Sequence, residues 1–208
     1  MESASLSESR GRRDAVDLLW TGGWDSTFLL LQTLLVDESP AAPHYLLDPA
    51  RPSLQIELVT MRRLRERIVA EHPSARDLLG PTSYHAVSDV ELDTDIVAAH
   101  ASILEKRHLG TQWTWMPSFC RQHSLNGFCL GVHGGDRTFD CLKAMMTDHR
   151  GSGGPGDQAE IARLDPSHAG TDEYTLFRYF AFPLLGLTKL DMEALALERG
   201  WSGIMEMA

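Results

Sequence analysis

The stretch from residue 14 to residue 36 constrains the fold of this chain more than any other, because its pattern changes from strand to helix across two adjacent glycines. Residues 16–20 form a short apolar run of the kind found in buried parallel strands. From residue 24 to residue 35 apolar residues recur at steps of three and four, which is typical of a helix with one buried face. Gly22 and Gly23, between the two, allow positive φ and the close approach of a ligand. A strand, a glycine turn and a helix in this order predict a parallel α/β fold with an anion site at the helix N-terminus.

Polar side chains surround this turn: the hydroxyls of Thr21, Ser26 and Thr27, and the carboxylate of Asp25. No Gly-Lys-[Ser/Thr] follows the turn and no G-x-G-x-x-G occurs in it, so neither a Walker A loop nor a dinucleotide fingerprint is present. One interpretation is a site for the phosphates of a nucleotide. The alternative is a glycine turn that serves stability alone, with Asp25 capping the helix.

Residues 21–27, TGGWDST, resemble the S-G-G-x-D-S/T loop of the PP-loop ATP pyrophosphatases, with Thr21 in place of the usual first serine. The hydroxyl group is kept. The resemblance implies ATP as cofactor, with Asp25 and Ser26 taking part in catalysis and Asp25 helping to position Mg²⁺. The nucleotide ligands that it implies in this loop are Thr21, Gly22, Gly23, Asp25, Ser26 and Thr27.

A second strand is predicted over residues 44–48, with Asp48 at its carboxyl end. Ligands of open α/β sheets collect at the carboxyl ends of the strands, and in the PP-loop family this region faces the adenosine. Asp48 is therefore a candidate nucleotide contact. An Asp that caps the loop before Pro49 is the alternative.

A second edge of this kind lies at residues 128–137. A helix is predicted to start near Pro117 and end near Leu125, followed by a buried strand over residues 128–133 and the turn Gly134-Gly135-Asp136-Arg137. The string LGVHGGDR is similar to the loop that follows the fourth strand of PP-loop enzymes, beside the nucleotide phosphates. The resemblance implies that His133, Asp136 and Arg137 orient phosphate, magnesium or substrate. Each also has a structural alternative: a satisfied strand-end histidine, a cap and a surface ion pair.

Residues 148–172 are rich in glycine, proline and small polar residues and predict a flexible loop or lid, or equally an inserted disordered segment. Residues 174–182 are apolar and aromatic and predict a strand.

Thr188 and Asp191 have capping-box spacing, which predicts a helix from Lys189 to about Arg199. The string FPLLGLTKLDM resembles a segment of PP-loop enzymes of the 7-cyano-7-deazaguanine synthase type. It implies Lys189 as a catalytic phosphate ligand, the alternative being an exposed first-turn lysine.

These segments occur in the family's order over roughly residues 14–200. The enzymes that the chain resembles belong to queuosine biosynthesis and are ligases. They adenylate the carboxylate of 7-carboxy-7-deazaguanine, let ammonia displace AMP, and dehydrate the amide to a nitrile after a second activation. They also hold zinc with a cysteine cluster after the last helix, whereas the three cysteines here, Cys120, Cys129 and Cys141, are far apart and none follows residue 141. We therefore expect no zinc site, and a small-molecule carboxylate that the sequence does not identify, with ammonia or an amine as the second partner.

Two other functions stay open. A tRNA-thiolating PP-loop enzyme would need catalytic cysteines and usually a basic surface, but the chain carries a net charge of −10. That charge does not favour a nucleic-acid partner. A nucleotide-binding protein that has lost catalysis is the third hypothesis.

The expected architecture is a doubly wound, mostly parallel sheet of five strands with helices on both faces. Residues 1–13 read as a flexible polar tail without the apolar stretch of a signal peptide, and residues 14–208 as a single domain. No apolar run reaches the ~20 residues of a membrane span. We expect a cytoplasmic protein, and the amphipathic last helix would also suit a homodimer.

Overall fold

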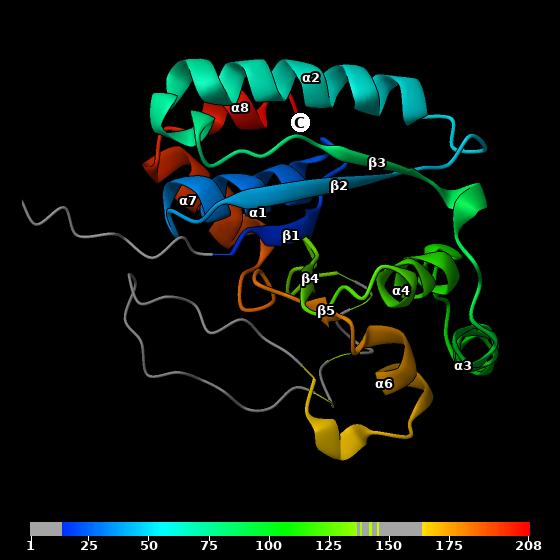
Figure 1. Ribbon diagram of the computed structural model, residues 1–208. Helices are drawn as coiled ribbons and strands as arrows, with labels where there is room; N and C mark the ends of the chain where they lie inside the picture. Colours follow the sequence, from blue (N-terminus) through cyan, green and yellow to red (C-terminus); the bar gives the residue numbers. More distant parts are fainter. Residues whose placement is uncertain (1–13, 137, 139–141, 143–144, 146–163) are drawn as a thin grey trace, which may run out of the picture.

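The computed structural model describes residues 14–136, 138, 142, 145 and 164–208, and its centre is a sheet of five parallel strands (Figure 1). The strands lie in the order β3-β2-β1-β4-β5. Their bounds are β1 Val16–Leu19, β2 Ala41–Leu47, β3 Ser83–Ala86, β4 Phe128–Cys129 and β5 Phe180–Ala181. The chain thus moves from β1 to one edge, then returns past β1 to the other edge, so that the strand order reverses between β1 and β4. The expected doubly wound α/β fold is confirmed.

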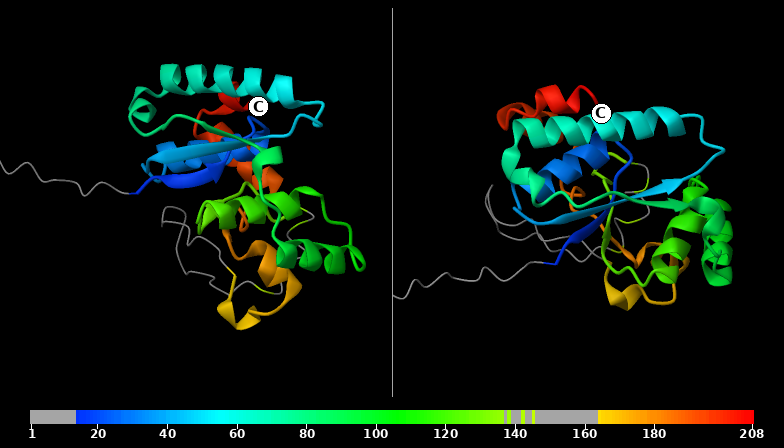
Figure 2. Two further views of the ribbon diagram at one scale, coloured as in Figure 1. Left: turned by 45° about the vertical axis from the view of Figure 1, so that its right-hand side comes forward. Right: turned by 45° about the horizontal axis from the view of Figure 1, so that its top comes forward.

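Helices cover both faces of the sheet (Figures 1 and 2). The first face carries α1 Trp24–Leu35, α2 Leu54–Glu71, α7 Lys189–Glu198 and α8 Ser202–Met205. The second face carries α3 Thr94–Leu104, α4 Gln112–Gln122 and α6 Asp172–Phe177. Short 3₁₀ helices complete the connections: η1 Pro73–Arg76, η2 Val87–Asp89 and η3 Pro166–His168. No helix in the described part of the chain is both long and apolar enough to cross a bilayer.

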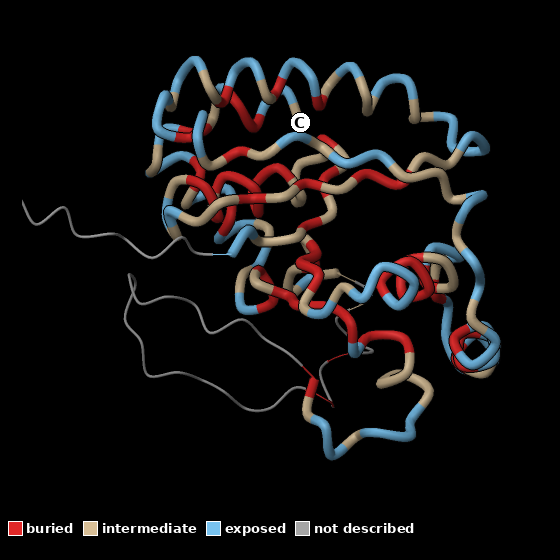
Figure 3. Tube along the Cα trace, in the orientation of Figure 1, coloured by how far each residue is buried: buried red, intermediate tan, exposed pale blue. Residues whose placement is uncertain are grey.

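Successive strand residues alternate between two buried clusters, as the pleat of a strand requires. Leu18 packs with α1 and α2, whereas its neighbour Leu19 packs against the cluster of α3, α4 and α6. In the same way, Cys129 faces the first cluster and Phe128 the second. Figure 3 shows the buried positions concentrated along the strands and the inner sides of the helices. The sheet is therefore buried on both faces, which explains the continuous apolar runs of its sequence.

Two predicted elements were wrong, and the strand expected over residues 128–133 is limited to residues 128–129. The aromatic stretch at residues 174–182 is not one strand: α6 ends at Phe177, and only residues 180–181 pair with β4. Helix is favoured there because the Thr171 hydroxyl accepts a hydrogen bond from the Tyr174 backbone N–H, and two acidic residues stand in the first turn. Helix α4 begins at Gln112, so that Pro117 lies inside it rather than in its first turn. Burial of Trp113, Met116 and Phe119 on one side of α4 outweighs the loss at the proline.

Several predictions fall partly or wholly outside the described residues. These are the polar tail at residues 1–13, Arg137, Cys141 and residues 148–163 of the expected lid. The remaining part of that segment, residues 164–172, is described. Leu164 is buried, Asp165 N donates to the Met145 carbonyl, and η3 follows.

Candidate functional site

The loop between β1 and α1 is folded by its own hydroxyl groups. The Ser26 Oγ atom lies 3.2 Å from the Thr21 Oγ1 atom and accepts a hydrogen bond of 3.2 Å from the Thr21 backbone N–H. The same hydroxyl donates to the Gly23 carbonyl at 3.0 Å, and Thr21 Oγ1 accepts from the Gly23 N–H at 3.3 Å. These contacts curl the loop over the start of α1, so that Thr21, Gly23 and Ser26 face a common opening.

The N-terminus of α1 faces this opening without a cap. Gly23 is the N-cap residue, and no side chain among the described residues caps the helix there. The alternative in which Asp25 serves as the cap is therefore wrong. The N–H groups of the first turn of a helix have no partner within the helix, and together with the dipole they favour an anion.

Glycine is required at two points around the loop for different reasons. Gly22 has a φ of +73°, and a Cβ there would lie 2.9 Å from Met61 Cγ of α2. Both glycines were expected to allow positive φ. Gly22 adopts it, whereas Gly23 has a negative φ. A Cβ on Gly131, just after β4, would lie 3.0 Å from the Asp25 carbonyl carbon and 3.1 Å from Ser26 N. Gly131 was not expected to belong to the site. It brings the backbone after β4 against the first turn of α1.

Thr27 does not belong to the opening, contrary to expectation. Its side chain is fully buried, and its Oγ1 accepts a hydrogen bond of 3.2 Å from Trp20 Nε1. The reason is helical geometry: one residue beyond Ser26, the side chain has turned by about 100° toward the core. This hydroxyl satisfies a buried indole and is not available to a ligand.

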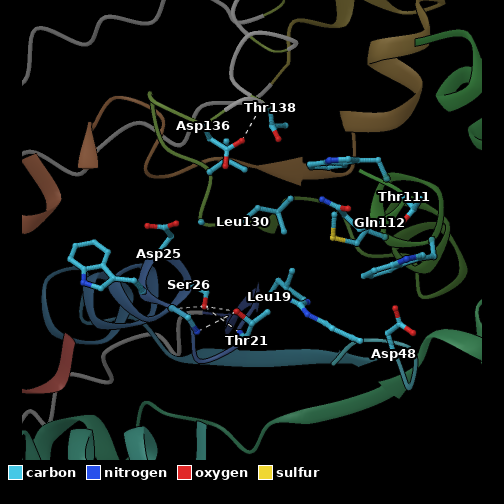
Figure 4. Close-up of a pocket in the computed structure, with 18 residues that line it drawn as sticks. Leu19, Thr21, Asp25, Ser26, Asp48, Thr111, Gln112, Leu130, Asp136 and Thr138 are labelled. Atoms are coloured by element: carbon cyan, nitrogen blue, oxygen red, sulfur yellow. Dashed lines mark hydrogen bonds between the residues drawn. The ribbon is translucent and has the colours of Figure 1, made fainter. Parts of the chain in front are cut away.

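A cleft of about 480 Å³ opens where the loop, the residues after β2, the residues after β4 and the start of α4 meet (Figure 4). This is the carboxyl edge of the sheet at the reversal of the strand order, where ligands of open α/β sheets bind. The volume lies in the usual range of small-molecule sites. The lining residues are Leu19, Thr21, Gly23, Trp24, Asp25, Ser26, Asp48, Arg51, Thr111, Gln112, Trp113, Trp115, Met116, Leu130, Gly131, Val132, Asp136 and Thr138.

The structure brings together some of the expected site residues and separates others. Asp48 lines the cleft and also closes its own turn, since Asp48 Oδ1 accepts from the Ala50 N–H at 3.0 Å. Asp136 lines the cleft while accepting from the Thr138 N–H at 2.7 Å. His133 is not among the lining residues, because its Nδ1 accepts from the Gly135 N–H at 3.1 Å within its own loop. For Asp48 and Asp136, the structural and the ligand-binding interpretations are therefore compatible.

Lys189 reaches the loop from the other end of the sequence. It is the first residue of α7, whose N-terminus has the expected capping box: the Thr188 hydroxyl accepts from Asp191 N, and the Asp191 carboxylate accepts from Thr188 N. The Thr188 hydroxyl also donates to the Asp191 carboxylate at 2.6 Å, and this bond, followed by that from the Thr188 N–H, keeps the pKa of Asp191 below its usual value. The Lys189 ammonium forms an ion pair with Asp25 Oδ1 and lies 3.8 Å from the centre of the Trp24 ring. A half-exposed cation is thus held beside the cleft, next to one of its carboxylates.

One wall of the cleft was missed by sequence reasoning. It consists of the N-terminal residues of α4, among them the Gln112 amide and the rings of Trp113 and Trp115. The aromatic spacing of this segment was a usable signal, but placing the helix start at Pro117 left these residues in a loop. The wall adds a planar, mostly apolar surface opposite the polar loop.

Mg²⁺ fits the donor set of the cleft. Asp25, Asp48 and Asp136 offer carboxylate oxygens, and Mg²⁺ is usually held by one or two carboxylates together with substrate phosphates. Within the described residues, no cluster of three or more His, Cys, Asp or Glu side chains could hold a metal ion without such help.

Cys120 and Cys129 are both buried. Burial, with a smaller contribution from the charge of Asp17, raises the pKa of the Cys120 thiol far above its ordinary value. A buried neutral thiol is a poor nucleophile. These two cysteines therefore give no support to sulfur transfer.

Comparison of the chain with models of known protein families and with curated proteins gave no match. The fold and the cleft define the class of the molecule, a doubly wound α/β protein with a cleft at its topological switch point.

Proposed function

We propose that this protein is an AMP-forming ATP pyrophosphatase that activates a small-molecule carboxylate for attack by ammonia or an amine. The observation that carries the proposal is the uncapped N-terminus of α1 beneath the Thr21–Ser26 hydroxyl pair, open to a cleft at the switch point of the sheet. Such an arrangement favours a multiply charged phosphate. The TGGWDST sequence of this loop, similar to that of PP-loop enzymes, supports ATP as the nucleotide.

In the proposed reaction a carboxylate oxygen attacks the α-phosphorus of ATP, and the bond to the oxygen bridging the α- and β-phosphates breaks. Pyrophosphate leaves, and an acyl-adenylate remains. Ammonia then attacks the acyl carbon and AMP departs, with loss of one proton to solvent. No side chain acts as a covalent nucleophile, so the protein acts by positioning and by electrostatic stabilisation.

Each side chain has a defined part in this reaction. The first-turn N–H groups of α1 and the hydroxyls of Thr21 and Ser26 bind the departing pyrophosphate. Lys189 offsets negative charge beside them, after exchanging its ion pair with Asp25 for a phosphate oxygen. Mg²⁺, held by Asp25 with Asp136 or with the phosphates alone, would neutralise charge on the polyphosphate.

The test is formation of AMP and pyrophosphate from Mg·ATP, with 7-carboxy-7-deazaguanine plus ammonia first and a panel of other carboxylates next. Ser26→Ala and Asp25→Asn should lose most of the turnover, because each removes a group that faces the polyphosphate. Arg62→Gln is the control, since Arg62 lies on the exposed side of α2 and its ion-pair partner among the described residues is Glu66. Binding of ATP without pyrophosphate release would instead identify a nucleotide-binding protein without catalysis.

A further inference from the structure

The charges around the cleft are unbalanced. Three carboxylates line it, those of Asp25, Asp48 and Asp136. Within the part of the chain that the structure describes, only Asp25 has a cationic partner, Lys189. Among the described lining residues, Arg51 supplies the one positive charge. Besides the N-terminus of α1 and Lys189, Arg51 is therefore the group that can attract an anionic ligand into this cleft.

Arg51 is anchored through one side of its guanidinium group. It follows β2 in a turn, where its backbone N–H donates to the Asp48 carbonyl at 3.0 Å. Its Nε donates to Ser53 Oγ at 3.1 Å and lies 3.0 Å from Glu57 Oε1. Within the described residues, these contacts leave the two terminal nitrogens without a hydrogen-bond partner. Since the side chain is 47% exposed, the terminal nitrogens can reach a ligand in the cleft.

The anchor itself is rigid. Glu57 is only 14% exposed, and its carboxylate also accepts from Ser53 Oγ at 2.6 Å and from Tyr45 Oη at 2.8 Å. Tyr45 is fully buried, and its burial, together with its bond to Glu57, raises its pKa, so that the hydroxyl remains a donor. Glu57 therefore receives three contacts from polar groups that tie it to β2 and to the start of α2. Such second contacts fix the direction of a binding side chain.

We propose that Arg51 binds the phosphate of the nucleotide through its terminal nitrogens and that Glu57 is its positioning residue. The inference rests on the proposed function only in naming a nucleotide as the source of the anion. A planar guanidinium donates two parallel hydrogen bonds to phosphate oxygens, which a lysine cannot do. The contact between Nε and Glu57 orients the guanidinium group, so that its two terminal nitrogens are positioned to donate to the phosphate.

The experiment is calorimetric titration of adenosine, AMP and ATP into the wild-type protein, Arg51→Gln, Arg51→Lys and Arg62→Gln. Arg62→Gln makes the same change in net charge on the exposed side of α2. Arg51→Gln should bind AMP and ATP roughly 10- to 100-fold more weakly, the usual range for loss of a charged hydrogen-bonded pair. Adenosine should bind equally to all four proteins. Arg51→Lys should fall between the wild type and Arg51→Gln, and thermal melting checks that each variant is folded.

Glu57→Gln tests the positioning role, because it keeps the size of the side chain and removes its charge. It should weaken AMP binding less than Arg51→Gln does, and the double variant should bind no more weakly than Arg51→Gln alone. Additive losses would show that Glu57 acts independently of Arg51.

The outcomes separate this inference from the proposed function. Weaker AMP binding by Arg51→Gln without pyrophosphate release by the wild type supports the inference and overturns the enzyme. Pyrophosphate release with equal AMP affinity in Arg51→Gln and Arg62→Gln overturns the inference alone. An equal loss of adenosine and AMP affinity also overturns it, since the phosphate would then play no part. If the wild type binds neither AMP nor ATP, both proposals fail.

Discussion

Gly131 is a position at which a single methyl group should disturb the site. In Gly131→Ala the new Cβ would lie 3.0 Å from the carbonyl carbon of Asp25 and 3.1 Å from its oxygen and from Ser26 N. All three are backbone atoms, so no side chain can rotate away to relieve the contact. The backbone after β4 and the first turn of α1 must therefore move apart by a few tenths of an ångström.

The magnitude follows from the cost of overpacking. An extra methyl group in a well-packed region destabilises by about 1–3 kcal/mol, which corresponds to a fall in Tm of ~2–12 °C for a chain of this size. Nucleotide affinity should fall as well, because Asp25 and Ser26, whose backbone would be displaced, line the cleft. We expect a loss of roughly tenfold or more, equivalent to about 1.4 kcal/mol.

Urea unfolding and AMP titration measure the two effects, with Gly186→Ala as the matched control. A Cβ at Gly186 would have no described atom within 4 Å, and the φ of Gly186 is not in the left-handed region. That variant should differ from the wild type by about 0.5 kcal/mol or less. Equal stability and equal AMP affinity of Gly131→Ala and Gly186→Ala would refute the close approach on which the site depends.

Two further predictions concern groups outside the cleft. Thr27→Val should destabilise the fold by about 1–3 kcal/mol, because it leaves the buried Trp20 Nε1 donor without its acceptor. Urea unfolding should show this loss, and Thr27→Ser should be close to the wild type. A fall in AMP affinity would mean that the Thr27 hydroxyl binds the ligand after all. His85 has a pKa below its ordinary value, first because of burial and then because of the charges of His44 and His123. The unfolded chain therefore takes up this proton first, and stability should fall as the pH drops below ~6.5. The carboxylate of Asp17, hydrogen-bonded to His44 at 2.9 Å, places a negative charge beside this pair of histidines. Urea unfolding between pH 7.5 and pH 6 should give a shallower dependence for His85→Phe than for the wild type, and equal slopes would contradict the assignment.

Local sequence signals predicted the parts of this molecule that depend on neighbouring residues. The strand, glycine turn and helix at residues 16–35 were predicted from a change of period, and the start of α7 from the capping box of Thr188 and Asp191. The alternation of apolar strands with helical patterns was enough for the doubly wound sheet. In these cases each residue and the partner that determines its role lie within a few positions of one another.

Long-range contacts account for most of the errors. The role of Gly131 depends on its approach to Asp25, more than 100 residues earlier, and nothing in its own neighbourhood indicates that contact. Thr27 was predicted to be a ligand because it continues a hydroxyl-rich motif. Its Oγ1 instead accepts a hydrogen bond in the core from the indole N–H of Trp20. The local preference of proline predicted a helix start at Pro117. In the structure, α4 begins five residues earlier, at Gln112, because its apolar side is buried against the sheet. Arg51 belongs to no sequence motif. Its proposed role in binding an anion follows from its place in a cleft that three carboxylates also line.

The most direct test of the central claim follows the oxygen atoms through the reaction. Turnover of Mg·ATP with the carboxylate that supports it, in water enriched with oxygen-18, should give AMP and pyrophosphate in equal amounts, both without the label. The oxygen that joins the α-phosphorus then comes from the carboxylate, as an acyl-adenylate requires. Oxygen-18 in the AMP would mean attack by water, and formation of ADP with phosphate would mean cleavage at the wrong bond. Either result, or the absence of any carboxylate-dependent turnover, would contradict the account.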